Sequence, residues 1–171
     1  MQSTEDLYSL LVPLSEERLI LPRASVAEVV RFSESESGET GHPWYKGTIP
    51  WHGRSIPLVS FEGLCGETAA EPGGRTRVVV VYALSPNDTL TTYGLLSEGF
   101  PQIVRVNREV ILQDLSYKPD EAKPVLCKIR MINEAALIPD LERVEAALRE
   151  YQSGARSGVS AEPEDPHTGL Q

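Results

Sequence analysis

The chain has 171 residues and a formal net charge of −9, and its length allows one domain with a sizeable core. The acidic balance argues against a nucleic-acid partner, because binding to phosphates depends on clustered lysine and arginine. Acidic residues concentrate before residue 40, and we interpret them as a solvated surface, with steering toward a basic partner as the alternative.

The sequence also bears on the compartment. No apolar run approaches the length of a membrane span, and the first residues lack the basic and apolar pattern of a secretion signal. Cys65 and Cys127 lie far apart in apolar settings, which argues against a disulfide framework or a zinc cluster and fits a reducing compartment. We therefore expect a cytoplasmic protein with no direct membrane insertion, no metal and no cofactor.

The N-terminal part begins with a predicted hairpin. Residues 8–14 alternate apolar and other side chains, as a strand facing a core does, and residues 19–21 form the returning strand. Residues 24–30 place Val26, Val29 and Val30 on one face of a predicted short helix. The polar, acidic residues 33–41 predict a mobile loop.

Two extended runs meet at a tight turn in the next stretch, which holds both tryptophans. Residues 45–51 alternate as a half-buried strand does. Residues 56–59 form an apolar run that contains a proline, which predicts an edge strand or the start of a strand. Residues 52–55 supply the turn, where Gly53 can adopt a positive φ.

The middle of the chain contains the most strand-like run. Residues 65–74 have the composition of an exposed loop. Residues 77–84 carry four consecutive valines without alternation, which predicts a strand buried on both faces. Residues 90–96 form its predicted partner strand, which Gly94 interrupts.

The C-terminal part predicts two more strands and a helix. Residues 125–133 predict a strand with one wet face, and residues 135–138 the last strand. Residues 139–151 have the apolar spacing of an amphipathic helix, with Pro139, Asp140 and Glu142 in its first turn.

These elements define the expected architecture. About ten short strands without βαβ alternation predict a mainly β protein built from barrels rather than a doubly wound sheet. We expect one domain over residues 1–152. Residues 153–171 are rich in Ser, Gly, Glu and Pro, cannot bury enough apolar surface to become ordered, and predict a disordered tail.

Three motifs together point to a known family. Residues 42–64 combine a proline–aromatic pair, a glycine after a short spacer, an apolar pair and then Gly53-Arg54-Ser55-Ile56-Pro57-Leu58-Val59. Residues 94–99 read Gly-Leu-Leu-Ser-Glu-Gly, and a strand, an Asn133-Glu134 turn, a strand and a helix end the chain. This combination, over roughly residues 7–151, resembles the CheW-like domain family of chemotaxis adaptors.

The resemblance implies both a fold and a function. The fold would be two intertwined, five-stranded SH3-like barrels with a groove between them, short helices and a C-terminal helix. The function would be that of a non-enzymatic adaptor that couples the cytoplasmic tip of a chemoreceptor to the regulatory domain of a CheA-type histidine kinase. Carried over by position, the expected receptor and kinase contacts are Val26, Glu28, Val29, Gly47, Trp51, His52, Gly53 and Ile103.

The turn departs from the family pattern. Family members usually have Asn-Leu-Arg-Gly where this chain has Pro50-Trp51-His52-Gly53. An imidazole lacks the bidentate fork of an arginine, so the departure bears on the choice of partner. Trp51 adds an apolar face suited to a partner contact, although Trp51 and Trp44 could equally be core aromatics. The divergent form resembles the ChpC type, which serves the chemosensory array of type IV pili and twitching motility.

Other function classes remain as alternatives. The sequence has no nucleophile elbow, no phosphate-binding loop and no zinc-protease motif, so we assign no catalytic residues. Cys65 with His42 and His52 could be drawn as a nucleophile and base or as metal ligands, but the spacing matches no such motif. The nearer alternatives are an adaptor of this fold that binds another array regulator, or a small barrel with an unrelated partner.

Overall fold

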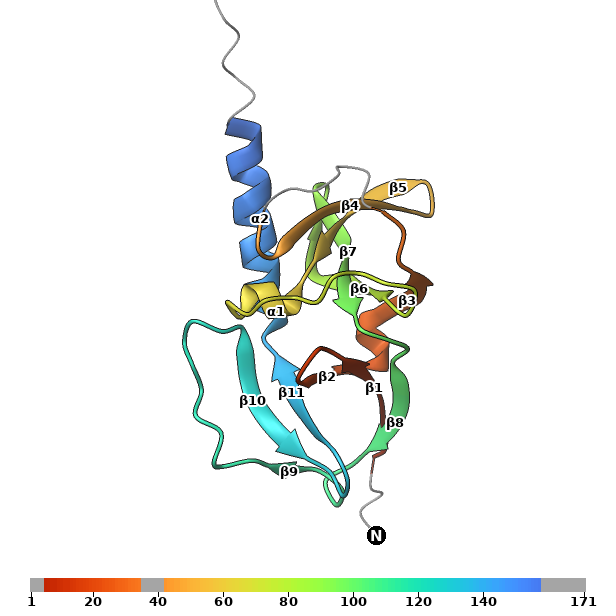
Figure 1. Ribbon diagram of the computed structural model, residues 1–171. Coiled ribbons are helices and arrows are strands. Elements are labelled where there is room, and N and C mark those ends of the chain that lie inside the picture. Colours follow the sequence, from red (N-terminus) through yellow and green to blue (C-terminus); the bar gives the residue numbers. More distant parts are fainter. Residues whose placement is uncertain (1–4, 35–41, 158–171) are drawn as a thin grey trace, which may run out of the picture.

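Two curled β-sheets and one long C-terminal helix make up the structure (Figure 1). The computed structural model describes residues 5–34 and 42–157. The chain starts in one sheet, builds the whole of the other, and then returns to the first, so the two sheets are intertwined. This confirms the expected mainly β fold of two intertwined small barrels, although one of the two curled sheets has six strands where five were expected.

The sheets contain six and five strands. The six-stranded sheet has the order β8-β1-β2-β11-β10-β9, with β1 (Leu7–Pro13), β2 (Arg18–Pro22), β8 (Gln102–Val106), β9 (Leu112–Gln113), β10 (Val125–Arg130) and β11 (Ala135–Pro139). The five-stranded sheet has the order β3-β6-β7-β5-β4, with β3 (Val26–Arg31), β4 (Tyr45–Trp51), β5 (Arg54–Val59), β6 (Arg77–Asn87) and β7 (Leu90–Ser97). Strands β3 and β4 are therefore the two edges of the second sheet.

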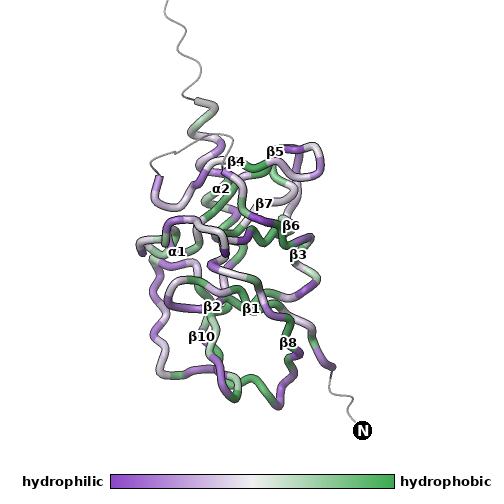
Figure 2. Tube along the Cα trace, turned by 45° about the vertical axis from the view of Figure 1, so that its right-hand side comes forward, coloured by the Kyte–Doolittle hydropathy of each residue, from purple (hydrophilic) through white to green (hydrophobic). Residues whose placement is uncertain are grey.

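Alternating side chains divide the interior into three hydrophobic clusters. In β6, Val78 and Val80 enter a cluster that belongs to the five-stranded sheet, whereas Val79 and Val81 enter a larger cluster that both sheets share. In β1, Leu10 enters the shared cluster, and its neighbour Leu11 enters a third cluster of the six-stranded sheet. Figure 2 shows hydrophobic residues gathered around β1 and β6. The expected burial of residues 77–84 on both faces is confirmed for the valines, which have no exposed surface.

Three helical segments complete the described part of the fold: η1 (Arg23–Ser25), α1 (Phe61–Leu64) and α2 (Leu141–Ser157). The short α1 begins at Ser60, whose Oγ accepts the N–H of Gly63 at 3.1 Å. A Cβ at Gly63 would lie 2.1 Å from the carbonyl oxygen of Pro43, so only glycine fits between α1 and the start of β4.

A buried carboxylate attaches α2 to β6. Glu145 is buried in α2 and accepts the backbone N–H groups of Leu84 and Ser85. Arg149, one turn further along the helix, pairs with Glu145 at 3.5 Å and donates to the carbonyl of Ser85. Because a buried charge must be paired or hydrogen-bonded, these contacts fix how α2 docks on the strand.

The predicted helix at residues 24–30 is wrong. A three-residue 3₁₀ turn at Arg23–Ser25 leads directly into β3, which pairs antiparallel with β6 and sets Val29 opposite Val79. β-Branched valines favour strands, and β3 forms its backbone hydrogen bonds with the buried strand β6. The spacing of the valines alone could not indicate this pairing.

The edge position predicted for residues 56–59 is also wrong. β5 starts at Arg54 and lies inside the sheet, between β4 and β7. Its parallel pairing with β7 begins at Leu58, one residue after Pro57, and β4 bulges opposite this point at Gly47, which has a φ of 88°. The bulge and the late start of the ladder let an internal strand include a proline.

The terminal helix is displaced from its predicted bounds. Pro139 is the last residue of β11, and α2 runs past the expected end at Tyr151 to Ser157. Asp140 precedes the helix, and its Oδ1 accepts the N–H of Arg143 at 3.3 Å. Residues 158–171 of the expected tail and residues 35–41 of the expected loop lie outside the described residues.

Candidate partner-binding surface

The β4–β5 hairpin ends in a two-residue turn with an unusual backbone. Trp51 pairs with Arg54, and the turn residues His52 and Gly53 have φ values of 47° and 74°. Positive φ at both positions defines a type I′ turn, which matches the twist of paired strands. Within the described residues, His52 is the only non-glycine residue with a positive φ, a conformation that places its imidazole at the tip.

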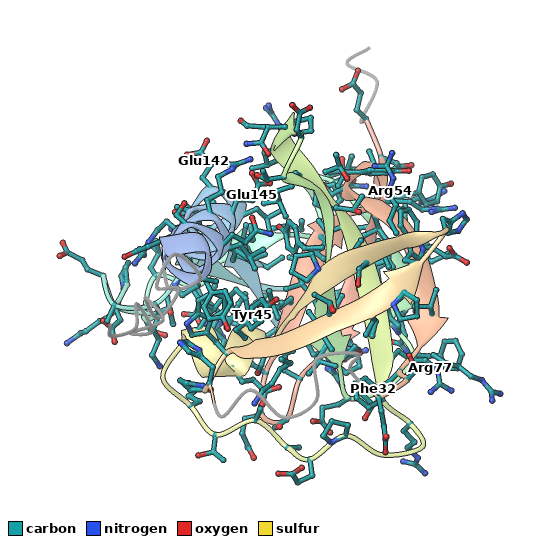
Figure 3. The ribbon with its side chains drawn as sticks, turned by 90° about the horizontal axis from the view of Figure 1, so that it is seen from above. Phe32, Tyr45, Arg54, Arg77, Glu142 and Glu145 are labelled. Carbon is teal, nitrogen blue, oxygen red and sulfur yellow. The ribbon has the colours of Figure 1, made fainter. Side chains whose placement is uncertain are left out.

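The hairpin end closes the open side of the five-stranded sheet. Figure 3 shows β4 and β5 crossing over the sheet toward β3. Glu28 of β3 accepts the indole N–H of Trp51 at 2.9 Å, and its carboxylate lies 3.0 Å from Nε2 of His52. The two edges of the curled sheet are therefore joined by side chains. We call Glu28, Trp51 and His52 the seam.

The electrostatics of the seam favour an ionised Glu28. The hydrogen bonds from His52, and then from Trp51, lower the pKa of the Glu28 carboxyl below its ordinary value. The indole and imidazole rings lie 4.4 Å apart between centroids, which holds them as one unit. The side chain of His52 is 68% exposed, so the seam presents a preorganised polar and aromatic surface to solvent.

A trough runs beside the seam. Its first part, about 360 Å³, is lined by Trp51, His52, Arg54, Tyr82, Ala83, Pro86, Thr91 and Thr92. A second part, about 750 Å³, shares Arg54, Pro86, Thr91 and Thr92 with the first and continues past Thr89 along the β6–β7 turn. The two shared linings make one continuous trough between the β4–β5 and β6–β7 hairpins.

The structure brings together four of the eight expected contacts. Glu28, Trp51, His52 and Gly53 meet at the seam and its turn. Ile103 lies on β8, the edge of the other sheet, opposite Leu10, and is 64% exposed.

The remaining three expected contacts are buried or partly buried within the fold. Val26 is buried in the shared cluster, and Val29 packs against that cluster with part of its surface open. Gly47 is buried in the bulge of β4, where its positive φ accounts for the glycine.

Two exposed tyrosines were not anticipated from the sequence. Tyr8, in a strand predicted to face the core, is 54% exposed opposite Arg105, and Tyr82 ends the valine run of β6 with half of its surface exposed at the trough. The available signal was the residue type, because tyrosine carries a polar tip that often reaches solvent or a partner.

The two tryptophans differ in their surroundings. Trp44 packs against the shared cluster, and its ring lies edge-on to His42 and Tyr151. Trp51 is only partly buried, with its indole N–H on Glu28. Trp51 also packs against the cluster of the five-stranded sheet, so both tryptophans are partly buried beside a core cluster, and Trp51 alone takes part in the seam.

Cys65, His42 and His52 have separate surroundings. His42 packs edge-on against Trp44, and His52 contacts Glu28. Burial raises the pKa of the Cys65 thiol to about 11, so this group stays protonated at neutral pH and is a poor nucleophile or ligand. Within residues 5–34 and 42–157, no three His, Cys, Asp or Glu side chains are grouped to hold a metal ion.

Over the same residues, no helix has the length and apolar character needed to cross a membrane.

Comparison with known proteins identifies the fold. The model of the CheW-like domain family matches residues 9–148. Among solved structures, the chain is similar to the scaffolding protein TtCheW from Thermoanaerobacter tengcongensis, with a TM-score of 0.64 and 18% sequence identity. That match covers 82% of this chain and 88% of TtCheW. A search of curated proteins finds no match.

Proposed function

The chain belongs to the CheW-like domain family, and we propose that it is a non-enzymatic, cytoplasmic adaptor of a bacterial chemosensory array. In this role it couples the tip of a chemoreceptor to the regulatory domain of a CheA-type histidine kinase. The observation that carries the proposal is the exposed type I′ turn at His52, held by Glu28 at the position where the family resemblance implies a partner contact.

The kinase is the partner assigned to the seam. Trp51 offers an aromatic anchor, and His52 and Arg54 offer polar groups around it, a combination enriched in binding hot spots. The seam fixes these side chains before binding, which lowers the entropic cost of association.

The receptor is assigned to the apolar surface of the neighbouring edge strands. β3 and β8 lie on the same side of the molecule in Figures 1 and 2. Val29 is partly open on β3, and Ile103 and Tyr8 are exposed on β8 and β1. An amphipathic receptor helix can dock its apolar face on such side chains. Since both surfaces belong to sheets that share one core, a shift of the receptor is transmitted to the kinase as a change in relative position.

A second candidate is an adaptor that binds another array regulator and never contacts a receptor. It is favoured by His52, which stands where family members usually carry arginine. An imidazole cannot form the bidentate carboxylate contact of a guanidinium, so a different partner surface would suit it.

The test is co-purification of partners from the protein's own cells with two single variants. Ile103→Asp should lose the receptor and Trp51→Ala the kinase, each leaving the other partner bound. Leu112→Asp, on the opposite edge strand of the six-stranded sheet, is the matched control for Ile103→Asp, because the two side chains are similarly exposed. Phe100→Ala removes an exposed aromatic ring away from the seam, and the unfolding transition of Trp51→Ala shows whether the loss of its packing disturbs the fold. The partners recovered identify the system, either chemotaxis or pilus-driven twitching motility.

Two outcomes would contradict the first proposal. Recovery of a different array protein, without receptor, supports the second candidate. Recovery of neither receptor nor kinase with the intact chain means that receptor–kinase coupling is the wrong function.

A further inference from the structure

The trough lies where two hairpins of the five-stranded sheet diverge. The parallel ladder between β5 and β7 begins at Leu58 and Gly94. Before these residues, the ladder partners of β5 lie only in β4 and those of β7 only in β6, as far as the structure describes them. Pro57, directly before the first pair, has no N–H with which to continue the ladder. The ends of the β4–β5 and β6–β7 hairpins therefore separate and form the two walls of the trough.

Each wall is held in place by another part of the molecule. On one side, the seam joins the end of the β4–β5 hairpin to β3, and Figure 3 shows Arg54 on the far side of the sheet from α2. On the other side, Glu145 of α2 accepts two backbone N–H groups of β6, and Gln152 donates to the carbonyl of Thr89 at 3.5 Å. The walls are thus fixed before anything binds between them, which lowers the entropic cost of binding.

Thr92 places a buried hydroxyl at this trough. Its side chain lines both parts of the trough and is only 6% exposed. It lies directly opposite Tyr82 in the β6–β7 ladder, so the two side chains share one face of the sheet. Among the described residues, the Thr92 hydroxyl has no hydrogen-bond partner. Because a buried hydroxyl without a partner is unfavourable, a polar group that enters the trough and pairs with it is stabilised.

Two charged side chains line the trough. Arg54 lines both parts, and Asp88 lines only the second part, at the β6–β7 turn. Within residues 5–34 and 42–157, neither side chain takes part in a salt bridge. Thr92 and Asp88 are four residues apart, which corresponds to at most about 13 Å along an extended strand. The trough thus offers a cation that reaches its seam end and an anion at its other end.

An extended peptide segment suits these features better than a helix or a small molecule does. The carbonyl groups of a helix are hydrogen-bonded within the helix, whereas those of an extended segment are free to accept the Thr92 hydroxyl. Small-molecule sites enclose most of their ligand, whereas this trough continues from a part of about 360 Å³ into one of about 750 Å³ along two hairpins. At its seam end, Trp51 and Tyr82 offer aromatic surface to a side chain of the segment.

We propose that the trough binds an extended segment of a partner protein that carries a carboxylate and, about four residues away, a cationic side chain. The carboxylate pairs with Arg54, the cation pairs with Asp88, and a backbone carbonyl of the segment accepts the Thr92 hydroxyl. The opposite charges fix the direction of the segment in the trough. This site goes beyond the proposed function, because neither a receptor nor a kinase is needed to define it.

Selection from a displayed library of random peptides of about nine residues, long enough to span the trough when extended, tests the site. Peptides selected on the full chain should carry Asp or Glu with Lys or Arg about four residues away. A synthetic copy of the most enriched peptide should shift the amide NMR signals of Arg54, Tyr82 and Thr92 and leave those of β9 and β10 in place. Selection on Arg54→Glu should replace the acidic residue of the peptides by a basic one. Arg108→Glu, the matched control at another exposed arginine, should select the original pattern.

Variants of Thr92 separate a binding role from a structural one. Thr92→Val keeps the shape of the side chain but removes the hydroxyl, so the affinity for the selected peptide should fall about threefold to tenfold. The unfolding midpoint of the free chain should not fall, because the hydroxyl makes no hydrogen bond to the described residues. Thr92→Ser keeps the hydroxyl and should retain most of the affinity.

Several results would overturn the site. These are a selection without the paired charges, the same pattern selected on Arg54→Glu, and peptide-induced shifts outside the trough. An unchanged peptide affinity in Thr92→Val would overturn the contact with the hydroxyl. Trough signals that move when the free chain is diluted would assign the trough to a second copy instead. A chain that binds receptor and kinase but selects no such peptide would leave the proposed function in place and contradict this site alone.

Discussion

The centre and the seam of the five-stranded sheet are built in different ways. At the centre, Val78 and Val80 of β6 and Leu58 of β5 are fully buried, and backbone ladders join the neighbouring strands. At the seam, β3 and β4 are opposite edges of the sheet, and the exposed side chains of Glu28 and His52 connect them together with the partly buried Trp51. Burial therefore fixes the fold at the centre, whereas exposed polar contacts shape a surface at the seam.

Leu58→Ala should have the largest effect on stability. The side chain has no exposed surface and packs in the cluster of the five-stranded sheet, so its truncation should lower the free energy of unfolding by about 2–5 kcal/mol. Leu84→Ala, at a leucine that is half exposed, should cost roughly 0.5 kcal/mol or less. Chemical denaturation measures both, and equal losses would mean that the centre does not dominate stability.

Gly94→Ala should have the second-largest effect on stability. A Cβ at this position of β7 would lie 2.5 Å from Cγ1 of Val78 and 3.2 Å from Cδ1 of Leu58, so the valine must move. Overpacking of this kind should cost about 1–3 kcal/mol. Gly74→Ala is the control, because no atom lies within 4 Å of its added Cβ. A stability loss at Gly74 as large as at Gly94 would contradict the packing argument.

Trp51→Phe should act locally. The change keeps an aromatic ring but removes the N–H that Glu28 accepts, so amide exchange should become faster at the hairpin end while global stability changes little. Trp44→Phe, within the aromatic group around Tyr151, should instead lower global stability. Accelerated exchange throughout β6 in Trp51→Phe would show that the seam supports the centre after all.

The smallest effect is the pH dependence of the seam. Because the folded-state pKa of Glu28 is lowered, its contribution is fully present above the ordinary glutamate pKa and is lost as the pH falls through the lowered value. The stability difference between the intact chain and Glu28→Gln should thus be fully present at about pH 5 and decrease as the pH falls through the lowered pKa of Glu28. A stability difference that grows as the pH falls would contradict a lowered pKa of Glu28 in the folded state.

The same contrast explains what the sequence could reveal. The valine run of β6, the N-terminal hairpin and the β4–β5 hairpin follow from periodicity and turn chemistry, which are local. β3 was predicted as a helix because the spacing of its valines also fits a helical face, and only its pairing with β6 decides the matter.

Contacts between residues that are far apart in the sequence could not be predicted from local patterns. Glu28 and Trp51 are 23 residues apart, and no local pattern indicates that the sheet curls enough for them to meet. The burial of Glu145 against Leu84 and Ser85 has the same origin, since an acidic residue in a helix otherwise predicts a solvated position. Turn chemistry predicted the position of the turn, and the family resemblance implied that it contacts a partner, but neither indicated that His52 would meet Glu28.

The most direct test of the account is the affinity of the purified chain for the regulatory domain of the CheA-type kinase from its own cells. Trp51→Ala should weaken binding at least about tenfold, as for an aromatic anchor, and Phe100→Ala should not change it. Trp51→Phe, which loses the seam hydrogen bond but keeps an apolar ring, should retain most of the affinity. Equal affinities of Trp51→Ala and the intact chain would contradict the assignment of this surface to the kinase.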